Sequence, residues 1–267
     1  FWPDSLSPLL DLNGYTISKL GSNVFSVINV DVNPGSGNID LKEGIIWLVY
    51  NTRLNGSAAN FLTVSNDARM LFYELVTPPT WTLALNNRAR LGVVSGAVPL
   101  NAWDGPVTLN GTAFLDGNNN SANSLKVNGP ISGSGPLVKL DPMTAYLANT
   151  NNTYTGSTIV SNGVLTVAHA GALPGYAAVG RVTVAPGATL AAMTGNGTAG
   201  WSKAQLDPLR ATTTFSAVSS ALGLDTSLGD FVYDSDIAYS YTLAKLGTNT
   251  LTLTGSNTIN SLRVQAG

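Results

Sequence analysis

The sequence predicts an all-β protein, a right-handed parallel β-helix with one or two loop or short-helix excursions. The first observation behind this prediction is a phrase that occurs three times. Residues 15–23 read Tyr-Thr-Ile-Ser-Lys-Leu-Gly-Ser-Asn, residues 241–249 read Tyr-Thr-Leu-Ala-Lys-Leu-Gly-Thr-Asn, and residues 134–142 keep the apolar-x-Lys-Leu core. Self-similarity at long spacing is typical of folds that stack repeated units.

The second observation is a series of short segments in which apolar and polar residues alternate, which predicts strands. These segments are residues 16–20, 24–32, 61–64, 80–85, 107–109, 182–184 and 251–254. The third is the turn dipeptides between them, such as Asn110-Gly111 and Pro186-Gly187. Strands and turns alone fit a sandwich or a barrel equally well, so the long-range repeat decides for a β-helix with coils of roughly 20–25 residues.

The expected core follows from the alternation. We predict that the inward-facing residues include Leu137, Leu147, Ile159, Leu165, Val182, Val184, Leu190, Leu251 and Leu253. Two segments depart from the rhythm. Residues 66–76 fit a short helix or a buried strand, and residues 201–228 are expected to form a loop or short-helix excursion. No linker divides the chain, so residues 1–267 are interpreted as a single β-helical segment of a longer repeat protein, with repeats starting near residues 15, 135 and 241.

The residues of the repeat also carry a family resemblance. The run Ile131-Ser-Gly-Ser-Gly-Pro-Leu-Val-Lys-Leu140, followed by Asn152-Thr-Tyr-Thr-Gly-Ser-Thr-Ile-Val-Ser-Asn-Gly163 and Val164-Leu-Thr-Val167, resembles the autotransporter-associated β-strand repeat. Residues 241–267 and 15–23 match parts of the same motif, so roughly a third of the chain is covered. The chain departs from the motif at Pro136 and at Asp141-Pro142, where a Gly-rich turn is expected. The resemblance implies a β-helix on an exported surface protein and does not imply an enzyme.

Composition restricts the function. Charged residues make up 10% of the chain, the formal net charge is −2, and Lys and Arg are scattered singly, which disfavours nucleic acid as a partner. Cysteine is absent, which excludes thiol catalysis and cysteine-ligated metal. No stretch is long and apolar enough to form a transmembrane segment. No cofactor is expected. The chain begins with Phe1-Trp2-Pro3 and has no signal-peptide pattern, so we expect the numbering to start inside a longer or processed product.

Candidate catalytic and metal-binding residues all favour structural roles. His169 is the only histidine, follows a strand and precedes Ala170-Gly171, so a turn residue is expected and not a catalytic base. The acidic group Asp225, Asp230, Asp234 and Asp236 could contribute to a Ca²⁺ site, but its spacing fits no known loop pattern, and turn or capping roles are preferred. We therefore predict no catalytic, cofactor-binding or metal site.

A carbohydrate cleft is the enzymatic alternative. Asp40, Glu43 and Arg53, with Trp47 and Tyr50 between them, could supply two carboxylates and aromatic platforms. The stretch Leu41 to Tyr50 nevertheless fits better as one hydrophobic strand with a charged end.

Two further sets of residues recur along the chain. The repeated lysines, Lys19, Lys139 and Lys245, are expected at coil corners, with the stem over apolar surface and the charge directed outward. Asparagines begin N-x-Ser/Thr sequons at Asn55, Asn110, Asn119, Asn151 and Asn196, and are expected to serve turns or to stack from coil to coil.

The sequence thus favours a non-enzymatic, exported structural protein at the cell surface or outside the cell, a β-helical stalk, fibre, surface-layer or adhesin segment. A β-helix polysaccharide lyase or hydrolase is the alternative, and a phage tail-spike-like fibre is a further one. Neither end offers a polar capping helix, and Gly267 aligns with Gly163, after which the earlier copy continues into a strand. We therefore expect self-association head to tail or continuation of a longer chain. A surface glycan or another cell-surface ligand is the expected external partner.

Overall fold

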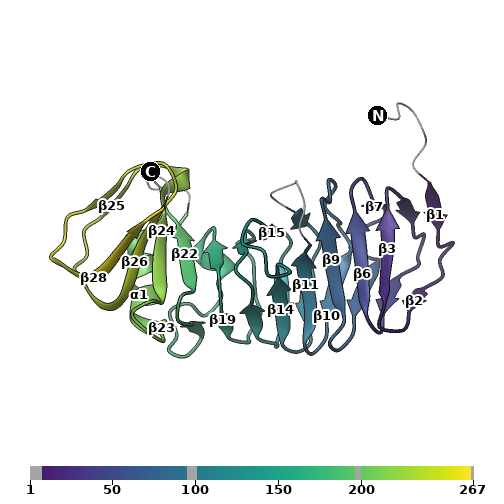
Figure 1. Cartoon of the computed structure of the whole chain (residues 1–267), viewed down its shortest axis with the longest axis horizontal. Helices are drawn as coiled ribbons and strands as arrows, with labels where there is room; N and C mark the ends of the chain where they lie inside the picture. Colours follow the sequence, from purple (N-terminus) through teal and green to yellow (C-terminus); the bar gives the residue numbers. More distant parts are fainter. Residues whose placement is uncertain (1–7, 95–100, 196–199, 266–267) are drawn as a thin grey trace.

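A computed structural model of the chain describes residues 8–94, 101–195 and 200–265. It shows parallel sheets stacked as a β-solenoid of about 11 turns (Figure 1). Every strand pair in the described residues is parallel, from β1 with β4 at one end to β26 with β28 at the other. The predicted parallel β-helix is confirmed.

Three sheets form the sides of the N-terminal half. Sheet A contains β1 (Leu9–Asp11), β4 (Asp31–Asn33) and β7 (Arg53–Leu54). Sheet B contains β2 (Ile17–Lys19), β5 (Ile39–Leu41), β8 (Phe61–Val64), β10 (Thr82–Leu85), β13 (Val107–Leu109) and β16 (Ile131–Gly133). Sheet C contains β3 (Val24–Ile28), β6 (Ile45–Val49), β9 (Arg69–Tyr73), β11 (Ala89–Val93), β14 (Ala113–Asp116), β17 (Leu137–Lys139), β19 (Thr158–Val160), β21 (Val182–Val184) and β23 (Thr214–Phe215).

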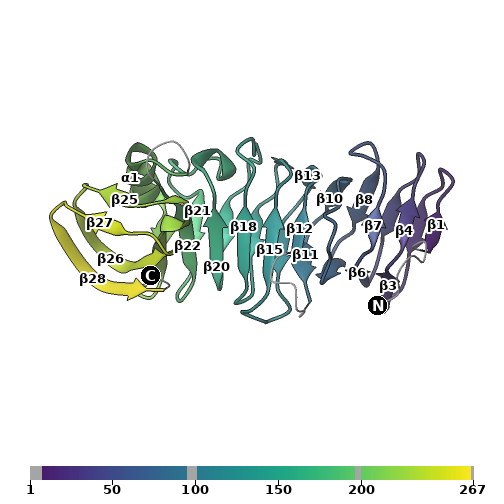
Figure 2. The ribbon, with the colours of Figure 1, turned by 90° about the horizontal axis from the view of Figure 1, so that it is seen from above.

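Two more sheets complete the C-terminal half. Sheet D contains β12 (Asn101–Trp103), β15 (Ser124–Val127), β18 (Thr144–Leu147), β20 (Val164–Val167), β22 (Thr189–Met193), β24 (Ala221–Asp225), β26 (Ile237–Leu246) and β28 (Asn257–Val264). Sheet E contains β25 (Phe231–Tyr233) and β27 (Leu251–Leu253). Seen from above, the strands follow one another along a single elongated stack (Figure 2). Two 3-10 turns, η1 (Ala170–Ala172) and η2 (Thr226–Leu228), lie at corners.

The coil length agrees with the expectation. Ser124 pairs with Thr144 and Val107 pairs with Ile131, so neighbouring coils are offset by 20 and 24 residues. The main exception is the coil between β21 and β23, where Thr183 pairs with Thr214. The extra residues hold helix α1 (Lys203–Thr212).

The core is a set of stacked apolar ladders inside the solenoid. On sheet C one ladder runs Ile46, Met70, Leu91, Leu115, Lys139, Val160 and Val184. Most of the predicted core residues are buried: Leu137, Leu147, Leu165, Val182, Val184 and Leu190. Leu251 and Leu253 are partly buried and pack against the core.

The prediction for Ile159 is wrong. In β19 the inward positions belong to Thr158 and Val160, which pair with Leu137 and Lys139, so Ile159 faces outward and is half-buried. A threonine can occupy the core here because its hydroxyl has a buried partner, the Tyr154 hydroxyl at 2.7 Å. The triplet Thr-Ile-Val contains no alternation from which the inward side could be read.

The structure decides the form of three further segments. Residues 66–76, expected as a short helix or a buried strand, contain the strand β9, with Met70 and Phe72 buried. The expectation of one strand from Leu41 to Tyr50 is wrong: β5 ends at Leu41, the chain turns a corner at Gly44 (φ 74°), and β6 follows at Ile45–Val49. Within 201–228, α1 is helical, but the chain returns to sheets C and D at β23 and β24.

Helix α1 packs on the side of the solenoid. Leu206 and Leu209 are buried, and the Trp201 indole N–H just before the helix donates to the Val167 carbonyl at 3.0 Å. Asp207, within the helix, accepts a hydrogen bond from the Tyr233 hydroxyl at 2.6 Å. No helix in the described part of the chain is long and apolar enough to cross a membrane.

Candidate functional site

Each copy of the repeated Lys-Leu phrase lies at a corner of its coil, but the three copies lie on three different sheets. Lys19 ends β2 in sheet B, Lys139 ends β17 in sheet C, and Lys245 lies near the end of β26 in sheet D. In each case the chain then bends and enters a strand of another sheet: β3, β18 or β27. The phrase therefore encodes the way in which a strand ends and the chain turns.

Each of these lysines occupies an inward position in its ladder. Lys19 pairs with Leu41, Lys139 lies between Leu115 and Val160, and Lys245 lies between Leu224 and Val264. The ammonium group donates to the main-chain carbonyl two residues further on, at Gly21, Asp141 and Gly247 respectively.

The ammonium groups of Lys19 and Lys139 also reach the next coil. Lys19 Nζ contacts the Glu43 carbonyl at 3.1 Å, and Lys139 Nζ contacts the Asn162 carbonyl at 3.0 Å. The expectation that the charge points outward is wrong, most clearly for Lys139, which is 1% exposed. Corner carbonyls that lack a strand partner need donors, and a flexible ammonium group with three N–H bonds provides them.

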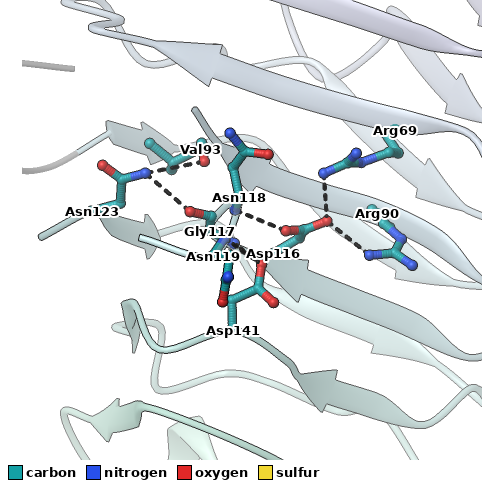
Figure 3. A network of polar contacts seen from close by, with 9 residues as sticks. All are labelled: Arg69, Arg90, Val93, Asp116, Gly117, Asn118, Asn119, Asn123 and Asp141. Carbon is teal, nitrogen blue, oxygen red and sulfur yellow. Dashed lines mark hydrogen bonds and ion pairs between the residues drawn. The ribbon is translucent and has the colours of Figure 1, made fainter. Parts of the chain in front are cut away.

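Lys139 belongs to a larger charged cluster, the Asp116 network, which consists of Arg69, Arg90, Asp116, Lys139 and Asp141. Asp116 Oδ2 contacts Arg69 Nη2 at 2.9 Å and Arg90 Nη1 at 3.0 Å, and the Asp116 side chain is 1% exposed (Figure 3). The two arginines are direct neighbours on adjacent strands. Like charges in this position repel each other, so Asp116 compensates a destabilising pair.

The loop after β14 is organised around the two carboxylates. Asp116 Oδ1 accepts from the Asn118 N–H at 2.9 Å, and Asp141 Oδ2 accepts from the Gly117 and Asn119 N–H groups, both at 3.1 Å (Figure 3). Asn118 and Asn119 both have positive φ, 50° and 58°. The Asp141 carboxylate thus fixes the turn of the preceding coil.

The carboxyl groups of Asp116 and Asp141 also interact with each other. Burial alone would raise the pKa of Asp116, but hydrogen bonds from Asp141, the Asn118 N–H and Arg90, together with the charge of Arg69, hold this pKa at about 2. The pKa of Asp141 is raised, mainly by the same contact with Asp116 and to a smaller extent by burial. The pair therefore retains a proton on Asp141 at a pH at which an isolated carboxyl group would have lost it.

Burial also governs Lys139. It lowers the pKa of this lysine to about 8, although the charges of Asp141 and Asp116 act in the opposite direction.

The chemistry that the Asp116 network could support is limited. Asp116 has its oxygens occupied, and Lys139 is bound to two carbonyls, so only Asp141, at the partly exposed edge, could exchange a proton with a bound molecule.

The other sequence candidates have separate local roles. His169 Nδ1 accepts from the Gly171 N–H at 3.2 Å and caps η1. Asp225 caps η2 through the Ser227 N–H, Asp230 and Asp236 accept the N–H groups of Thr250 and Ser256, and Asp234 pairs with Lys203 at 2.7 Å. Within the described ranges, no three His, Asp or Glu side chains are placed to hold one metal ion.

The suggested carbohydrate cleft is not assembled. Asp40 lies in β5 of sheet B, Trp47 in β6 of sheet C and Arg53 in β7 of sheet A, so these side chains belong to three different sides of the solenoid. Asp40 pairs with Lys42 at 2.5 Å, and Arg53 lies 3.7 Å from Asp31. Glu43 contributes its carbonyl to Lys19, and Tyr50 packs edge-on against Tyr73.

The sequon asparagines mostly serve turns. The Asn110 amide donates to Asn86 Oδ1 of the coil before it at 3.0 Å, the Asn151 N–H donates to Asn149 Oδ1, and the Asn55 carbonyl accepts from the Trp81 indole. Asn119 belongs to the loop fixed by Asp141. Asn196 lies outside the described residues.

No local pattern in the sequence indicates the Asp116 network. Its members are separated by 47 residues between Arg69 and Asp116, more than any local pattern spans. Once the coil length is known, the spacing of Arg69, Arg90, Asp116 and Asp141, about one coil each, is the signal that would have found them.

An open groove of about 610 Å³ lies near the C-terminal end of sheet D. It is lined by Gly187, Ala217, Val218, Ser219, Thr242, Ser261 and Arg263. The Arg263 guanidinium, the one charged group in this lining, is held by a hydrogen bond to Thr189 Oγ1 at 2.6 Å. The lining otherwise offers hydroxyl groups and small side chains.

Comparisons with protein-family models, with curated proteins and with solved structures find no match for the chain.

The Asp116 network yields a first prediction. Asp116→Asn removes the charge that separates Arg69 from Arg90, and we expect a loss of about 2 kcal/mol in the free energy of unfolding, the range for hydrogen bonds to charged groups. Urea unfolding measures it. Asp67→Asn is the matched control, because Asp67 pairs with Arg88 on the exposed surface and should cost about 0.5 kcal/mol or less. Equal losses in the two variants would contradict a stabilising network.

Lys139 yields a second prediction. Its pKa is about 8 in the folded protein against 10.5 for a free lysine, so between these values the unfolded chain binds more protons and the free energy of unfolding rises with pH. Lys139→Met should lose this rise. Urea unfolding across this pH interval measures the slope, and Lys126→Met, on the outer face of β15, should keep the wild-type slope. A wild-type slope in Lys139→Met would contradict the assignment.

Proposed function

We propose that this chain is a non-enzymatic structural segment of an exported protein, a β-helical stalk, fibre, surface-layer or adhesin element located outside the cell or on its surface. The observation that carries the proposal is the use of the polar side chains. The repeated lysines, the corner asparagines and the Asp116 network are engaged in closing corners and joining coils. A chain whose repeated phrase specifies corners is suited to providing length and surface.

The resemblance to the autotransporter-associated β-strand repeat supports the same proposal. The motif residues Ile131–Gly133 and Leu137–Lys139 form β16 and β17, and the lysine of the motif is the corner donor described above. A repeat built in this way adds coils without needing a new core design. An exported surface location is part of the proposal through this resemblance.

Apolar residues are exposed at both ends of the described solenoid, which suggests that a further coil covers each end. In the first coil, Tyr15, Leu20 and Phe25 are 75%, 69% and 39% exposed, and in the last strand Leu262 and Val264 are 56% and 64% exposed. Phe25, Leu262 and Val264 occupy inward ladder positions. We propose that these surfaces are covered by a further coil, supplied by a longer chain or by another copy through parallel strand addition.

The groove lined by Arg263 supports an adhesive role with a glycan as ligand. Its hydroxyl groups can bind sugar hydroxyls, and the guanidinium can bind a carboxylate on the same ligand. It lies at the C-terminal part of the solenoid, away from the Asp116 network.

The end-to-end proposal can be tested with the purified chain. We expect its mass in solution to rise with concentration, because the open strand edges and apolar ends associate. Light scattering after size exclusion measures the mass. The double variant Leu262→Lys and Val264→Lys should remain monomeric, since it places charges in the joint. A wild-type chain that stays monomeric at all concentrations would count against association of copies and leave only continuation of a longer chain.

A β-helix polysaccharide lyase or hydrolase is the second candidate, and the observation that favours it is the contact between the carboxyl groups of Asp116 and Asp141, which raises the pKa of Asp141. A protonated carboxyl group at a partly exposed position could act as a general acid. We expect no turnover of acidic or neutral polysaccharides, because only one member of the pair is accessible. Turnover that is abolished by Asp141→Asn, or by Asp40→Ala or Glu43→Ala, would overturn the structural proposal.

A tail-spike-like trimeric fibre is the least supported alternative. It would need a continuous apolar stripe on the outside. The outer row of sheet C contains Val24 and Ile45 and, further along, Val138 and Ile159. Arg69 and Arg90 interrupt it, and it continues with Thr183 and Thr214.

A further inference from the structure

The corner between β19 and β20 contains the dipeptide Asn162-Gly163. The chain has six Asn-Gly pairs, at residues 13, 55, 110, 128, 162 and 196. In such a pair the glycine main-chain nitrogen can attack the asparagine side-chain carbonyl carbon and displace ammonia. The reaction needs the two atoms close together, a stabilised amide anion, and access for water. These three requirements separate Asn162 from the other pairs that the structure describes, which exclude Asn196-Gly197.

The reacting atoms are already close. The Gly163 N–H donates to Oδ1 of Asn162 at 2.7 Å, so the carbonyl carbon Cγ, one bond from that oxygen, lies near the attacking nitrogen. Gly163 has a φ of 66°, and a Cβ at this position would lie 2.5 Å from the carbonyl oxygens of Asp141 and Met143. The corner is thus held in this form by the coil before it. Asn162 is exposed, so ammonia can leave and water can enter.

Lys139 meets the second requirement, the stabilisation of the amide anion. Its Nζ donates to the main-chain carbonyl of Asn162 at 3.0 Å, and this carbonyl belongs to the peptide whose N–H must lose its proton. The resulting negative charge is shared between the Gly163 nitrogen and the Asn162 oxygen. A cation fixed at that oxygen stabilises the anion before the reaction begins. The second bond of Lys139, to the Asp141 carbonyl, keeps the ammonium group in place.

The other described pairs lack this combination. The Gly14 and Gly129 N–H groups are bound to the carbonyls of Pro34 and Trp103 at 3.1 and 3.2 Å. The Asn110 amide is held by Asn86. At Asn55 the carbonyl does accept a hydrogen bond, but from the neutral Trp81 indole.

We propose that Asn162 is a self-modification site, at which this corner converts the asparagine into aspartate and isoaspartate. Hydroxide removes the Gly163 N–H proton, the nitrogen forms a bond to Cγ of Asn162, and the amide nitrogen leaves as ammonia after taking up a proton. Water then opens the cyclic imide at either carbonyl. Opening at the main-chain carbonyl gives isoaspartate, and opening at the side-chain carbonyl gives aspartate.

The product changes this corner. A carboxylate at residue 162 adds a negative charge near the Lys139 ammonium group, and isoaspartate lengthens the main chain by one carbon. The lengthening falls between two hydrogen bonds that join this coil to the one before it, Ser161 N–H to Lys139 O at 2.8 Å and Val164 N–H to Met143 O at 3.2 Å. The modification would therefore loosen one corner in the middle of the stack. This inference does not depend on the proposed function.

Peptide mapping by mass spectrometry tests the proposal. The folded full chain is incubated at neutral pH, below the pKa of about 8 of Lys139, so that its ammonium group stays charged. The deamidated fraction is followed for each Asn-Gly peptide, with isoaspartate separated by chromatography. We expect Asn162 to convert about tenfold faster than Asn55, the magnitude that one charged hydrogen bond provides. In urea the difference should disappear, because all pairs then share the same unfolded environment.

Two variants assign the cause. Lys139→Met should slow conversion at Asn162 about tenfold and leave Asn55 unchanged. If this variant fails to fold, the comparison between native and urea-unfolded wild type still decides. Asn162→Gln, which cannot close the same ring, should show no conversion at this position. The proposal is overturned if Asn162 stays intact in the folded chain while Asn55 reacts, or if unfolding leaves the preference for Asn162 unchanged.

Discussion

The structure depends on main-chain hydrogen bonds that run from coil to coil. Each strand is short, so corners make up a large part of every coil, and corner carbonyls and N–H groups do not fall into a ladder. In a single sheet these groups would face water, but in a stacked solenoid many are covered by the next coil. The fold therefore requires side chains that satisfy corner groups.

Lysine, asparagine and aspartate meet this requirement in different ways. Lys139 enters from an inward position and donates to carbonyls of two successive coils. Asn60 and Asn123 donate to main-chain carbonyls through a neutral amide: Asn60 reaches Gly35 and Gly37 of the coil before it, and Asn123 reaches Gly117 in its own loop. Asp141 accepts two N–H groups of the preceding coil. Polar groups that would be expensive inside an ordinary core are tolerated because each has partners.

The same requirement explains why charge is sparse but concentrated. A buried ammonium at Lys139 needs carboxylates nearby, and Asp141 and Asp116 supply them. Asp116 in turn lies between two arginines that would otherwise repel. The Asp116 network extends over four coils, and its ion pairs hold these coils together. The partly exposed Asp141 and the exposed Asn162 lie at the edges of this cluster, where groups that join coils remain accessible.

The sequence by itself determined the class of fold, the approximate coil length and the positions of several strands. These features are local: alternation over a few residues, turn dipeptides and a repeated phrase can be recognised without knowing what lies beside them. The tertiary structure alone decided which side chains face inward in Thr158-Ile159-Val160 and that Lys139 points into the core. It also brought Arg69, Arg90, Asp116 and Asp141 together. The physical reason is that contacts in a solenoid join residues one coil apart and the exact offset changes with each corner, so a coil length taken from the sequence locates the partners only to within a few residues.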